Sequence, residues 1–316
     1  MRRPLPRVTA AAGCGGSGRE LARFGDLAAL DAVLVGPVGA RPGEAAGGPV
    51  RTRLSVSPSG LVHTPAPALP AAQVVDDLLP WFRARGVPVV LAVRGGTTGA
   101  VADLLLGLRR SLDFGVVAAV EIDLTADRED TRPSIGALAS TEPAGPWSAD
   151  PQACLKLLSA AREQLPRDLL LTAKLAGECP DPLGTARAAI GGGARALVLS
   201  GSVPTGPQEH LVGPAVGPVT LGLVSRVRAA MAAGRVPDVP VVAVGGVHDV
   251  RTALLARGAG ASGVQLGSGL LGDPALLWEV HDALALAPDP EDLAPPLPLV
   301  DDDHATPVPT TPAPTD

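Results

Sequence analysis

The sequence contains no tyrosine and no asparagine, only 2% of its residues are aromatic, and lysine occurs only at Lys156 and Lys174. Glycine and proline are abundant instead, with 38 and 34 copies, which is the pattern of a strongly biased genome. A missing asparagine in this chain can therefore reflect compositional drift. A surviving lysine, by contrast, is a candidate for a specific role.

An excess of positive charge is also lacking. The net charge is −6, the pI is about 5.4, and no cluster of lysine and arginine stands out. Proteins that bind nucleic acid usually carry a basic patch or stripe, so this composition argues against that class of partner. Small molecules or proteins are the expected partners.

Long apolar runs are missing too, because prolines such as Pro58, Pro65, Pro67 and Pro70 interrupt the uncharged stretches. This excludes an ordinary membrane span. The three cysteines are odd in number, and their spacing suits neither a disulfide framework nor a zinc site or other metal site. We therefore expect a soluble cytoplasmic protein with free thiols.

What the chain does contain is an alternation of short apolar runs with segments of helical period. Apolar runs without polar alternation, each followed by a helix, predict a parallel sheet that is buried on both faces. Eight such units predict an α/β fold of the (β/α)8 TIM barrel type, whose functional site lies at the carboxyl ends of the strands. The expected strands are residues 7–13, 31–35, 88–93, 116–124, 168–175, 194–200, 239–246 and 262–269. The expected helices are residues 18–27, 71–85, 98–112, 150–165, 181–193, 218–234, 248–258 and 273–284.

Two segments interrupt this alternation. Residues 51–70 alternate in polarity and then become proline-rich, which favours a small hairpin and loop over the barrel mouth. Residues 288–316 are rich in proline, threonine and aspartate and too poor in apolar residues to fold, so we expect a disordered tail. The predicted organisation is a barrel over residues 1–287 and a tail over residues 288–316.

The strongest chemical signal is the stretch VVAVGGVHDVRTALLARGAGASGVQLGSGLL near the C-terminus. One predicted strand ends in Gly245 and Gly246, and the next ends in Gly267 and Ser268. Glycine allows the backbone to approach a ligand closely, and the loops after strands seven and eight of a barrel commonly bind phosphate. The alternative is that these glycines only form tight turns between strand and helix.

Four blocks of the chain resemble the dihydroorotate dehydrogenases, particularly their class 1 branch. They are AAGCGGSGRELARFGDLAALDAVLV, LLLTAKLAG, GPAVGPVTLGLVSRV and AVGGVHDVRTALLARGAGASGVQLGSGLL, and they occur in the same order and spacing as in that family. The resemblance covers roughly residues 7 to 285. It implies a barrel that holds FMN at its mouth, oxidises a dihydropyrimidine and passes the electrons to a second acceptor.

The flavin positions of the family are largely retained. The resemblance places Ala12 and Gly13 beside the isoalloxazine ring and Lys174 at its pyrimidine side, where a cation stabilises the anion of the reduced flavin. The alternative for Lys174 is a structural ion pair with a carboxylate. The remaining flavin and phosphate positions are Gly213, Gly245, Gly246, Gly267 and Ser268.

The substrate positions are not retained. The family has a motif N-x-S-C-P-N or N-x-S-S-P-N after its fourth strand, in which the cysteine or serine takes a proton from the substrate. In VEIDLTADR, Asp123 replaces the first asparagine, Ala126 stands at the base, and Arg128 replaces the second asparagine. A methyl group cannot abstract a proton.

Further losses concern a lysine and two asparagines. The lysine expected after the second strand corresponds to Gly36, and the asparagines of the substrate loop and of the sixth strand correspond to Thr64 and Gly201. Compositional drift could explain the loss of one asparagine, but not the simultaneous loss of the base, the lysine and the asparagines. The site that binds orotate in the family is therefore altered here.

Five other side chains could supply a base, namely Asp127, His63, His210, Cys14 and Cys179, although each is more often a solvated loop residue. Asp123 is expected to hydrogen-bond the flavin or to pair with Lys174. None of them is singled out as the catalytic residue.

Three hypotheses for function follow. The first is an FMN-binding oxidoreductase of the dihydroorotate dehydrogenase type that acts on a CH–CH bond of an altered substrate. The second is a catalytically silent relative that serves as a binding or assembly protein, and the third is ordinary dihydroorotate oxidation with a relocated base. The resemblance also implies a small-molecule substrate and, as protein partners, a second copy in a homodimer or an electron-transfer protein.

Overall fold

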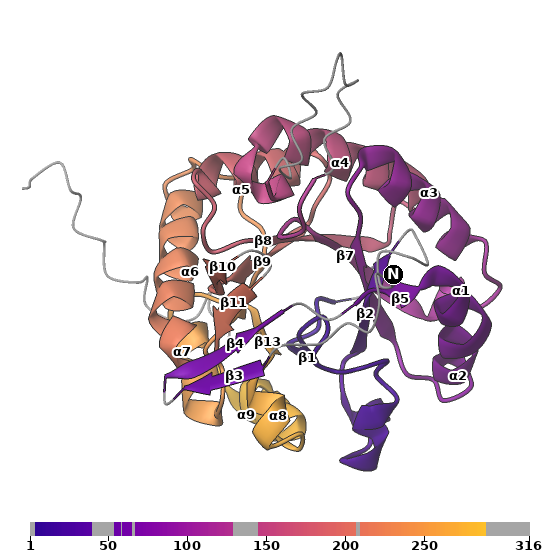
Figure 1. The fold of residues 1–316 in the computed structure, drawn as a ribbon, viewed down its shortest axis with the longest axis horizontal. Coiled ribbons are helices and arrows are strands. Elements are labelled where there is room, and N and C mark those ends of the chain that lie inside the picture. The colour runs from indigo at the N-terminus through magenta and orange to yellow at the C-terminus, as the bar shows by residue number, and fades with distance from the viewer. Residues whose placement is uncertain are drawn as a thin grey trace, which may run out of the picture.

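The computed structural model describes residues 4–39, 54–57, 59–64, 67–128, 145–206 and 209–288. Within them, nine parallel strands form one curled sheet, and the helices surround its outer face (Figure 1). From one end of the sheet to the other, the strands are β1 (Val8–Ala10), β13 (Gly263–Leu266), β12 (Val241–Val244), β9 (Ala196–Ser200), β8 (Leu170–Leu175), β7 (Val117–Asp123), β6 (Val89–Arg94), β2 (Val33–Gly39) and β5 (Leu69–Pro70).

Each of the eight segments predicted as strands overlaps one strand of this sheet, and β5 adds a ninth beside β2. Among the described residues no ladder joins β1 to β2. The two nevertheless meet just beyond the end of β1, where the Gly13 amide donates a hydrogen bond of 2.8 Å to the Gly36 carbonyl. The fold is thus an α/β fold with a strongly curled parallel sheet.

Burial on both faces explains the apolar character of the strands. All seven residues of β7 are buried, as are all those of β2, β9, β12 and β13. The polar exceptions on β7 and β8 follow a period of two, because Glu121 is in register with Thr172 and Asp123 with Lys174. Alternate residues of a strand share one face, so these four side chains line the same side of the sheet.

The helices begin at recognisable capping signals. Side chains of Thr97, Asp150, Asp181 and Asp249 each accept a hydrogen bond from a backbone amide of the first helical turn, which would otherwise have no partner. The helices that follow them are α3 (Thr98–Arg109), α4 (Pro151–Gln164), α5 (Pro182–Gly191) and α7 (Val250–Gly258). The others are α1 (Ala71–Gln73), α2 (Leu79–Arg83), α6 (Gly217–Ala232), α8 (Gly269–Gly272) and α9 (Leu276–Leu286).

Two predicted helices differ in detail. Residues 18–27 form no α-helix but two short 3-10 turns, Glu20–Arg23 and Leu27–Ala29. The second predicted helix, residues 71–85, contains a π-helical stretch at Val74–Leu78 between α1 and α2. Pro80 lies just after that stretch, and a proline inside a helix removes a backbone donor, so a local change of hydrogen-bonding pattern is expected there.

A second, antiparallel sheet has the order β10-β11-β4-β3, and we call it the cover sheet. Its hairpin β3 (Leu54–Ser57) and β4 (Gly60–His63) falls in the segment that was predicted to form one. The other half, β10 (Val203–Gly206) and β11 (Glu209–Val212), follows β9 and was not predicted. Figure 1 shows β3, β4, β10 and β11 side by side although they come from distant parts of the chain.

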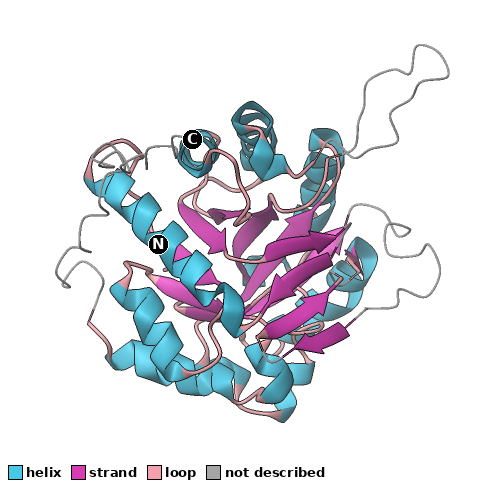
Figure 2. Cartoon of the chain, turned by 60° about the vertical axis from the view of Figure 1, so that its left-hand side comes forward, coloured by secondary structure: helices cyan, strands magenta, loops and turns pink. Residues whose placement is uncertain are grey.

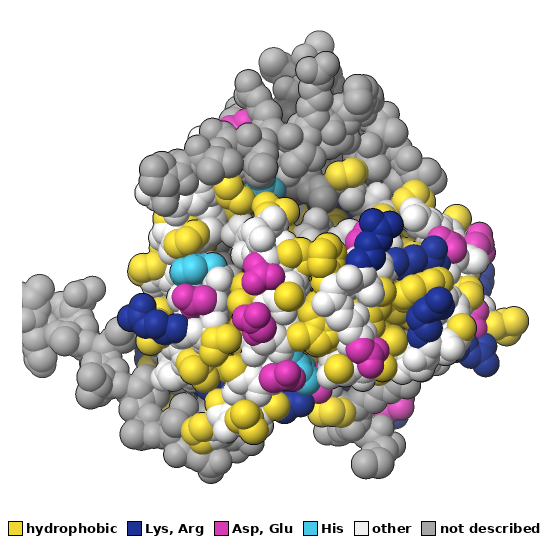
Figure 3. Space-filling view, turned by 90° about the horizontal axis from the view of Figure 1, so that it is seen from below, with side chains coloured by type: hydrophobic (Ala, Val, Ile, Leu, Met, Phe, Trp, Pro, Cys, Tyr) yellow, Lys and Arg dark blue, Asp and Glu magenta, His cyan; other side chains and the backbone are white. Residues whose placement is uncertain are grey.

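The expected tail, residues 288–316, lies outside the described residues except for its first residue. No helix in the described part of the chain is both long and apolar enough to cross a membrane. The side view in Figure 2 shows the strands enclosed by helices. On the face seen in Figure 3, apolar and acidic side chains are interspersed, and the basic ones gather mainly towards one end.

Candidate active site

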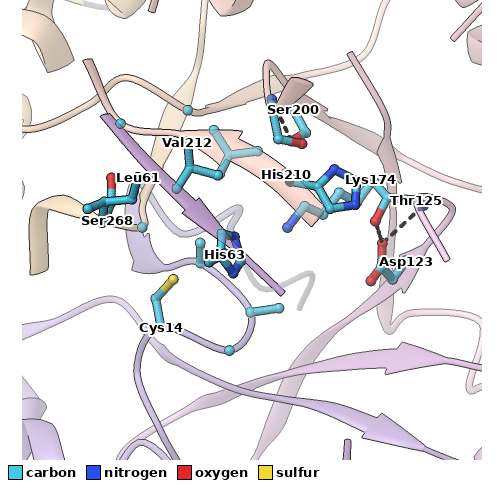
Figure 4. A pocket seen from close by; sticks show the side chains of 18 of the residues that line it. Cys14, Leu61, His63, Asp123, Thr125, Lys174, Ser200, His210, Val212 and Ser268 are labelled. Carbon is cyan, nitrogen blue, oxygen red and sulfur yellow. Dashed lines mark hydrogen bonds between the residues drawn. The ribbon is translucent and has the colours of Figure 1, made fainter. Parts of the chain in front are cut away.

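A cavity of about 520 Å³ lies where several strands of the curled sheet end, beneath the cover sheet (Figure 4). The strands β1, β7, β8, β9, β12 and β13 lead into it, and β4 and β11 close it from above. All eight residues predicted to bind the cofactor line this single cavity. They are Ala12, Gly13, Lys174, Gly213, Gly245, Gly246, Gly267 and Ser268.

Lys174 is the last residue but one of β8, and only 9% of it is exposed. Its neighbour in register, Asp123 on β7, is equally buried, so an ion pair between the two was a reasonable expectation. The structure shows otherwise, because Oδ1 of Asp123 accepts hydrogen bonds from the amide and the hydroxyl of Thr125, at 3.1 and 2.6 Å. Among the described residues, no carboxylate pairs with the Lys174 ammonium.

Glycine serves two different purposes in the cavity wall, one for the backbone conformation and one for the space that it leaves. Gly245 and Gly246 have φ values of 115° and 77°, and a Cβ on Gly246 would collide with Gly217. Their turn therefore requires glycine whether or not a ligand is present. A Cβ on Gly267 would make only ordinary contacts, 3.7 Å from Cys14 Sγ and 3.8 Å from Ala11 Cβ. Packing does not demand glycine at residue 267, so its missing side chain leaves room for a ligand.

Two histidines lie beneath the cover sheet. His63 on β4 and His210 on β11 are partners in register, and both line the cavity. Nδ1 of His63 lies 2.9 Å from the Thr64 carbonyl, which can only accept, so Nδ1 carries the proton and Nε2 keeps its lone pair. Burial lowers the pKa of His63, and the charges of His210 and Lys174 lower it further against the opposing effect of the Thr64 carbonyl. A neutral imidazole with a free Nε2 is able to accept a proton.

Ala126, which the resemblance places where the family has its base, is not among the described residues that line the cavity. Ala126 packs against the hydrophobic core, and its carbonyl accepts a hydrogen bond of 3.1 Å from the Trp147 amide. Arg128 forms an ion pair of 2.9 Å with Asp150. Asp127 forms an isolated bridge with Pro146 and is not among the described residues that line the cavity.

The two cysteine candidates have different surroundings. Cys179 is not a solvated loop residue as expected, because its Sγ is buried and donates to the Ser148 carbonyl at 2.9 Å. Cys14 does line the cavity, but burial raises its pKa more strongly than the nearby Lys174 lowers it. A thiol with a raised pKa is a weak nucleophile and a poor proton acceptor at neutral pH.

Some lining residues were missed from the sequence. Arg94 ends β6 and Thr125 follows β7, so the rule that sites lie at the carboxyl ends of barrel strands could have found both. Ser200 and Ser202 also line the cavity, and their hydroxyl groups lie 3.1 Å apart. Ser200 ends β9, and Ser202 follows it.

The chain is similar to catalytic subunits of dihydroorotate dehydrogenase B (NAD(+)) from several organisms. The chain is 30% identical over 283 residues to the catalytic subunit of dihydroorotate dehydrogenase B (NAD(+)) of Desulforudis audaxviator (strain MP104C), which covers 84% of this chain and 83% of that relative. The chain belongs to the dihydroorotate dehydrogenase family. It is also 26% identical over 293 residues to the same subunit of Geotalea uraniireducens (strain Rf4), over 88% of this chain and 87% of the relative.

A likeness in structure agrees with this assignment. The crystal structure of the Eimeria tenella dihydroorotate dehydrogenase in complex with ferulenol covers 88% of this chain with a TM-score of 0.67, and the chain covers 80% of that structure. The two sequences are only 17% identical, so this comparison speaks for the fold alone. No family model matches the chain.

Two departures from the dihydroorotate dehydrogenase pattern are enforced by packing. Gly36, which the resemblance places where the family has a lysine, has a φ of 134°, and a Cβ there would lie 2.5 Å from the Ala92 carbonyl oxygen. Gly201, which the resemblance places where the family has an asparagine, has no room either, because a Cβ would collide with the Thr220 hydroxyl. The backbone at both positions is therefore shaped for glycine, and these losses are part of the fold of this chain.

Proposed function

We propose that this family member is an FMN-dependent oxidoreductase that acts on a CH–CH bond of a small molecule other than dihydroorotate. The observation that carries the proposal is the Lys174 ammonium, which has no carboxylate partner in the described part of the chain and lies in the wall of the same cavity as the glycine turns. Bound FMN would supply the hydride acceptor for such a reaction. The cavity, of about 520 Å³, falls within the usual size of cofactor sites.

The residues of the cavity fit the parts of FMN. The open wall at Gly267 and the hydroxyl of Ser268 suit a phosphate, and the turn at Gly245 and Gly246 brings backbone close to it. Ala12 and Gly13 offer a small surface for a flat ring. Lys174 would place a fixed positive charge beside the ring portion that becomes electron-rich on reduction.

The altered substrate follows from the rest of the site. Ala126 offers no base, and neither Gly36 nor Gly201 has space for a lysine or an asparagine. Among the remaining groups, His63 fits the role of proton acceptor, because the Thr64 carbonyl fixes its tautomer with Nε2 free. We infer that the reduced flavin passes its electrons to a second acceptor, and that the chain works with an electron-transfer protein or with a second copy of itself. The term catalytic subunit in the relatives' names supports a protein partner.

Two broader expectations belong to this proposal. We infer that the curled sheet closes into a complete (β/α)8 barrel, which the hydrogen bond from Gly13 to Gly36 across the gap supports. We also infer that residues 1–287 act as one catalytic domain.

The proposal is tested by the visible spectrum of the purified protein and by titration with FMN. A flavin spectrum, or quenching of FMN fluorescence on binding, is expected for the wild type. Colourless protein that leaves FMN fluorescence unchanged would overturn it.

A second candidate function is a silent binding protein, which the absence of a base at Ala126 favours. A protein that binds FMN but whose flavin is reduced by no compound in a panel of dihydro-substrates, under anaerobic conditions, would support this candidate instead.

A further inference from the structure

One hydrogen bond crosses the inside of the curled sheet. Nε2 of Gln265 on β13 donates to Oε2 of Glu121 on β7 at 2.5 Å, although three strands, β12, β9 and β8, separate β13 from β7 in the sheet. Both side chains are buried, with 4% and 1% of their surface exposed. Glu121 lies two residues before Asp123 on the same face of β7, so this contact lies directly below the cavity.

The two remaining oxygen atoms of this pair have no partner. Oε1 of Glu121 and Oε1 of Gln265 are both buried and lack a hydrogen bond among the described residues. A carboxylate and an amide oxygen can only accept, so leaving both without a donor is costly. A single proton on Oε1 of Glu121 would give both oxygen atoms a partner if the two groups form a planar acid and amide pair, in which the O–H donates to the amide oxygen while the N–H donates to the acid carbonyl.

The surroundings favour that proton. Complete burial raises the pKa of Glu121, and the negative charge of Asp123 raises it further. The Lys174 ammonium and the Gln265 hydrogen bond act in the opposite direction, yet the pKa stays above its usual value. Burial outweighs attraction here because removing a carboxylate from water costs more than one nearby cation returns.

We propose that Glu121 is a neutral carboxylic acid at neutral pH, joined to Gln265 by two hydrogen bonds, and that it is a positioning residue that adds no negative charge below Lys174. An ionised Glu121 would offset the charge of that ammonium. Asp123 is hydrogen-bonded to Thr125 and is the carboxylate that remains charged beside Lys174. The consequence is that one carboxylate, and not two, opposes the lysine in the cavity floor. The effect on flavin rests on the proposed function, whereas the protonation of Glu121 does not.

Infrared spectroscopy of the full chain tests the protonation directly. At pH 8, a carbonyl-stretch band of a protonated carboxyl group is expected in the wild type, with an isotope shift when glutamate is labelled with ¹³C. The band should vanish in Glu121→Gln and remain in the control Glu163→Gln, whose residue is exposed on α4. Absence of the band in the wild type, or its persistence in Glu121→Gln, would overturn the proposal. This measurement requires no FMN.

Stability gives an independent readout. A group whose folded pKa is raised contributes stability below its unfolded pKa, which is about 4.3 for glutamate, and loses it as the pH rises through the folded pKa. Glu121→Gln keeps both hydrogen bonds and cannot ionise. Its stability relative to the wild type should therefore increase from pH 5 to pH 8. A relative stability that stays constant over this interval would show that Glu121 is already ionised in the folded protein.

The midpoint potential of bound FMN completes the test. Glu121→Gln should leave the potential unchanged, because it replaces one neutral group by another, while Lys174→Ala serves as the variant that does shift it. A higher potential in Glu121→Gln would mean that a negative charge had been removed, which contradicts the proposal. If no FMN binds, the proposed function fails, and the infrared band still decides the protonation state of Glu121. If Glu121→Gln does not fold, the infrared spectrum of the wild type with ¹³C-labelled glutamate decides it alone.

Discussion

Asp123 and Lys174 lie opposite each other in the register of β7 and β8, yet they do not form an ion pair. The carboxylate instead bonds the amide and hydroxyl of Thr125, two residues further along its own chain. The Asp123 carboxylate, which the strand register places beside Lys174, therefore forms a local Asx-type turn with Thr125. This relationship leaves a cation available in the cavity wall.

Lys174→Ala is expected to weaken FMN binding and to lower the flavin's reduction potential. A fixed cation stabilises the reduced anion more than the neutral oxidised ring. We expect a loss of affinity of roughly tenfold, or about 1.4 kcal/mol, and a potential lower by about 30 mV for the same energy shared by two electrons. Fluorescence titration and spectroelectrochemistry measure the two quantities.

Lys156→Ala is the matched control, because Lys156 is exposed on α4 and should affect neither quantity. Lys174→Arg should rescue only in part, since a planar guanidinium does not replace a compact ammonium. If Lys174→Ala leaves affinity and potential unchanged, the lysine has a structural role only.

Dihydroorotate should reduce the bound flavin slowly or not at all. The resemblance places Ala126 where the family has its base, and general-base assistance is typically worth on the order of 10²–10⁴-fold in rate. Anaerobic stopped-flow mixing with dihydroorotate follows the bleaching of the flavin. Rapid bleaching would contradict the prediction and would favour a relocated base, which His63→Asn should then abolish.

Gly267→Ala should weaken FMN binding by roughly tenfold without loss of stability. The added methyl group makes only ordinary contacts with Cys14 and Ala11, so the fold accepts it, but it occupies the cavity wall. Gly99→Ala on the exposed face of α3 is the control and should leave binding intact. Titration with FMN and thermal unfolding separate the two effects, and a variant that binds FMN normally would remove residue 267 from the site.

His63 should titrate below its usual pKa and carry its proton on Nδ1. Burial and the nearby charges of His210 and Lys174 lower the pKa, and the Thr64 carbonyl fixes the tautomer. Nitrogen-15 NMR of labelled histidine, with His63→Asn for assignment, measures both. A signal from the Nε2-protonated tautomer would exclude His63 Nε2 as proton acceptor.

Asp31, which lies just before β2 and pairs with Arg7 just before β1, should contribute a stability that depends on pH. Burial raises its pKa, but two hydrogen bonds to the Arg7 side chain at 3.1 Å, one to its amide, and the charges of Arg7 and His281 bring the pKa to about 2. A lowered folded pKa gives stability that is present above the unfolded value of about 3.9 and is lost as the pH falls through the folded value.

Asp31→Asn should therefore cost on the order of 1–2 kcal/mol at pH 7 and less near pH 2. Urea unfolding at several pH values measures this difference. An equal loss at pH 7 and pH 2 would mean that the carboxylate acts through its shape and not its charge.

The fold was predictable because its signals are repeated along the chain. The eight predicted strands are mainly apolar along their length, since burial on both faces leaves little reason for a polar alternation. The strands β10 and β11 carried no such signal, because each has only four residues and neither has an apolar run. They pair with each other, and β11 joins the sheet through β4, which lies far away in the sequence. Residues 18–27 were expected to form an α-helix but form two short 3-10 turns. Gly18 and Gly25 leave only six residues between them, which is too short for two full turns of α-helix.

The site was predictable in outline and not in detail. Glycine pairs and a lone lysine at strand ends identified the residues that share the cavity. Sequence could not show that Asp123 bonds Thr125, because register and local turn compete and their balance depends on side-chain geometry. Nor could it show that the backbones of Gly36 and Gly201 exclude a side chain, since the crowding comes from Ala92 and Thr220 on other segments.

The cover sheet is built from two connections, one after β2 and one after β9. The glycine turns at Gly245 and Gly267 instead follow directly on strands of the core sheet. Natural selection can thus revise the two connections while the core strands stay as they are, because surface connections tolerate change that buried strands do not. His63 and His210 lie on these connections, so a change at either would alter the cavity wall while the buried strands stay in place.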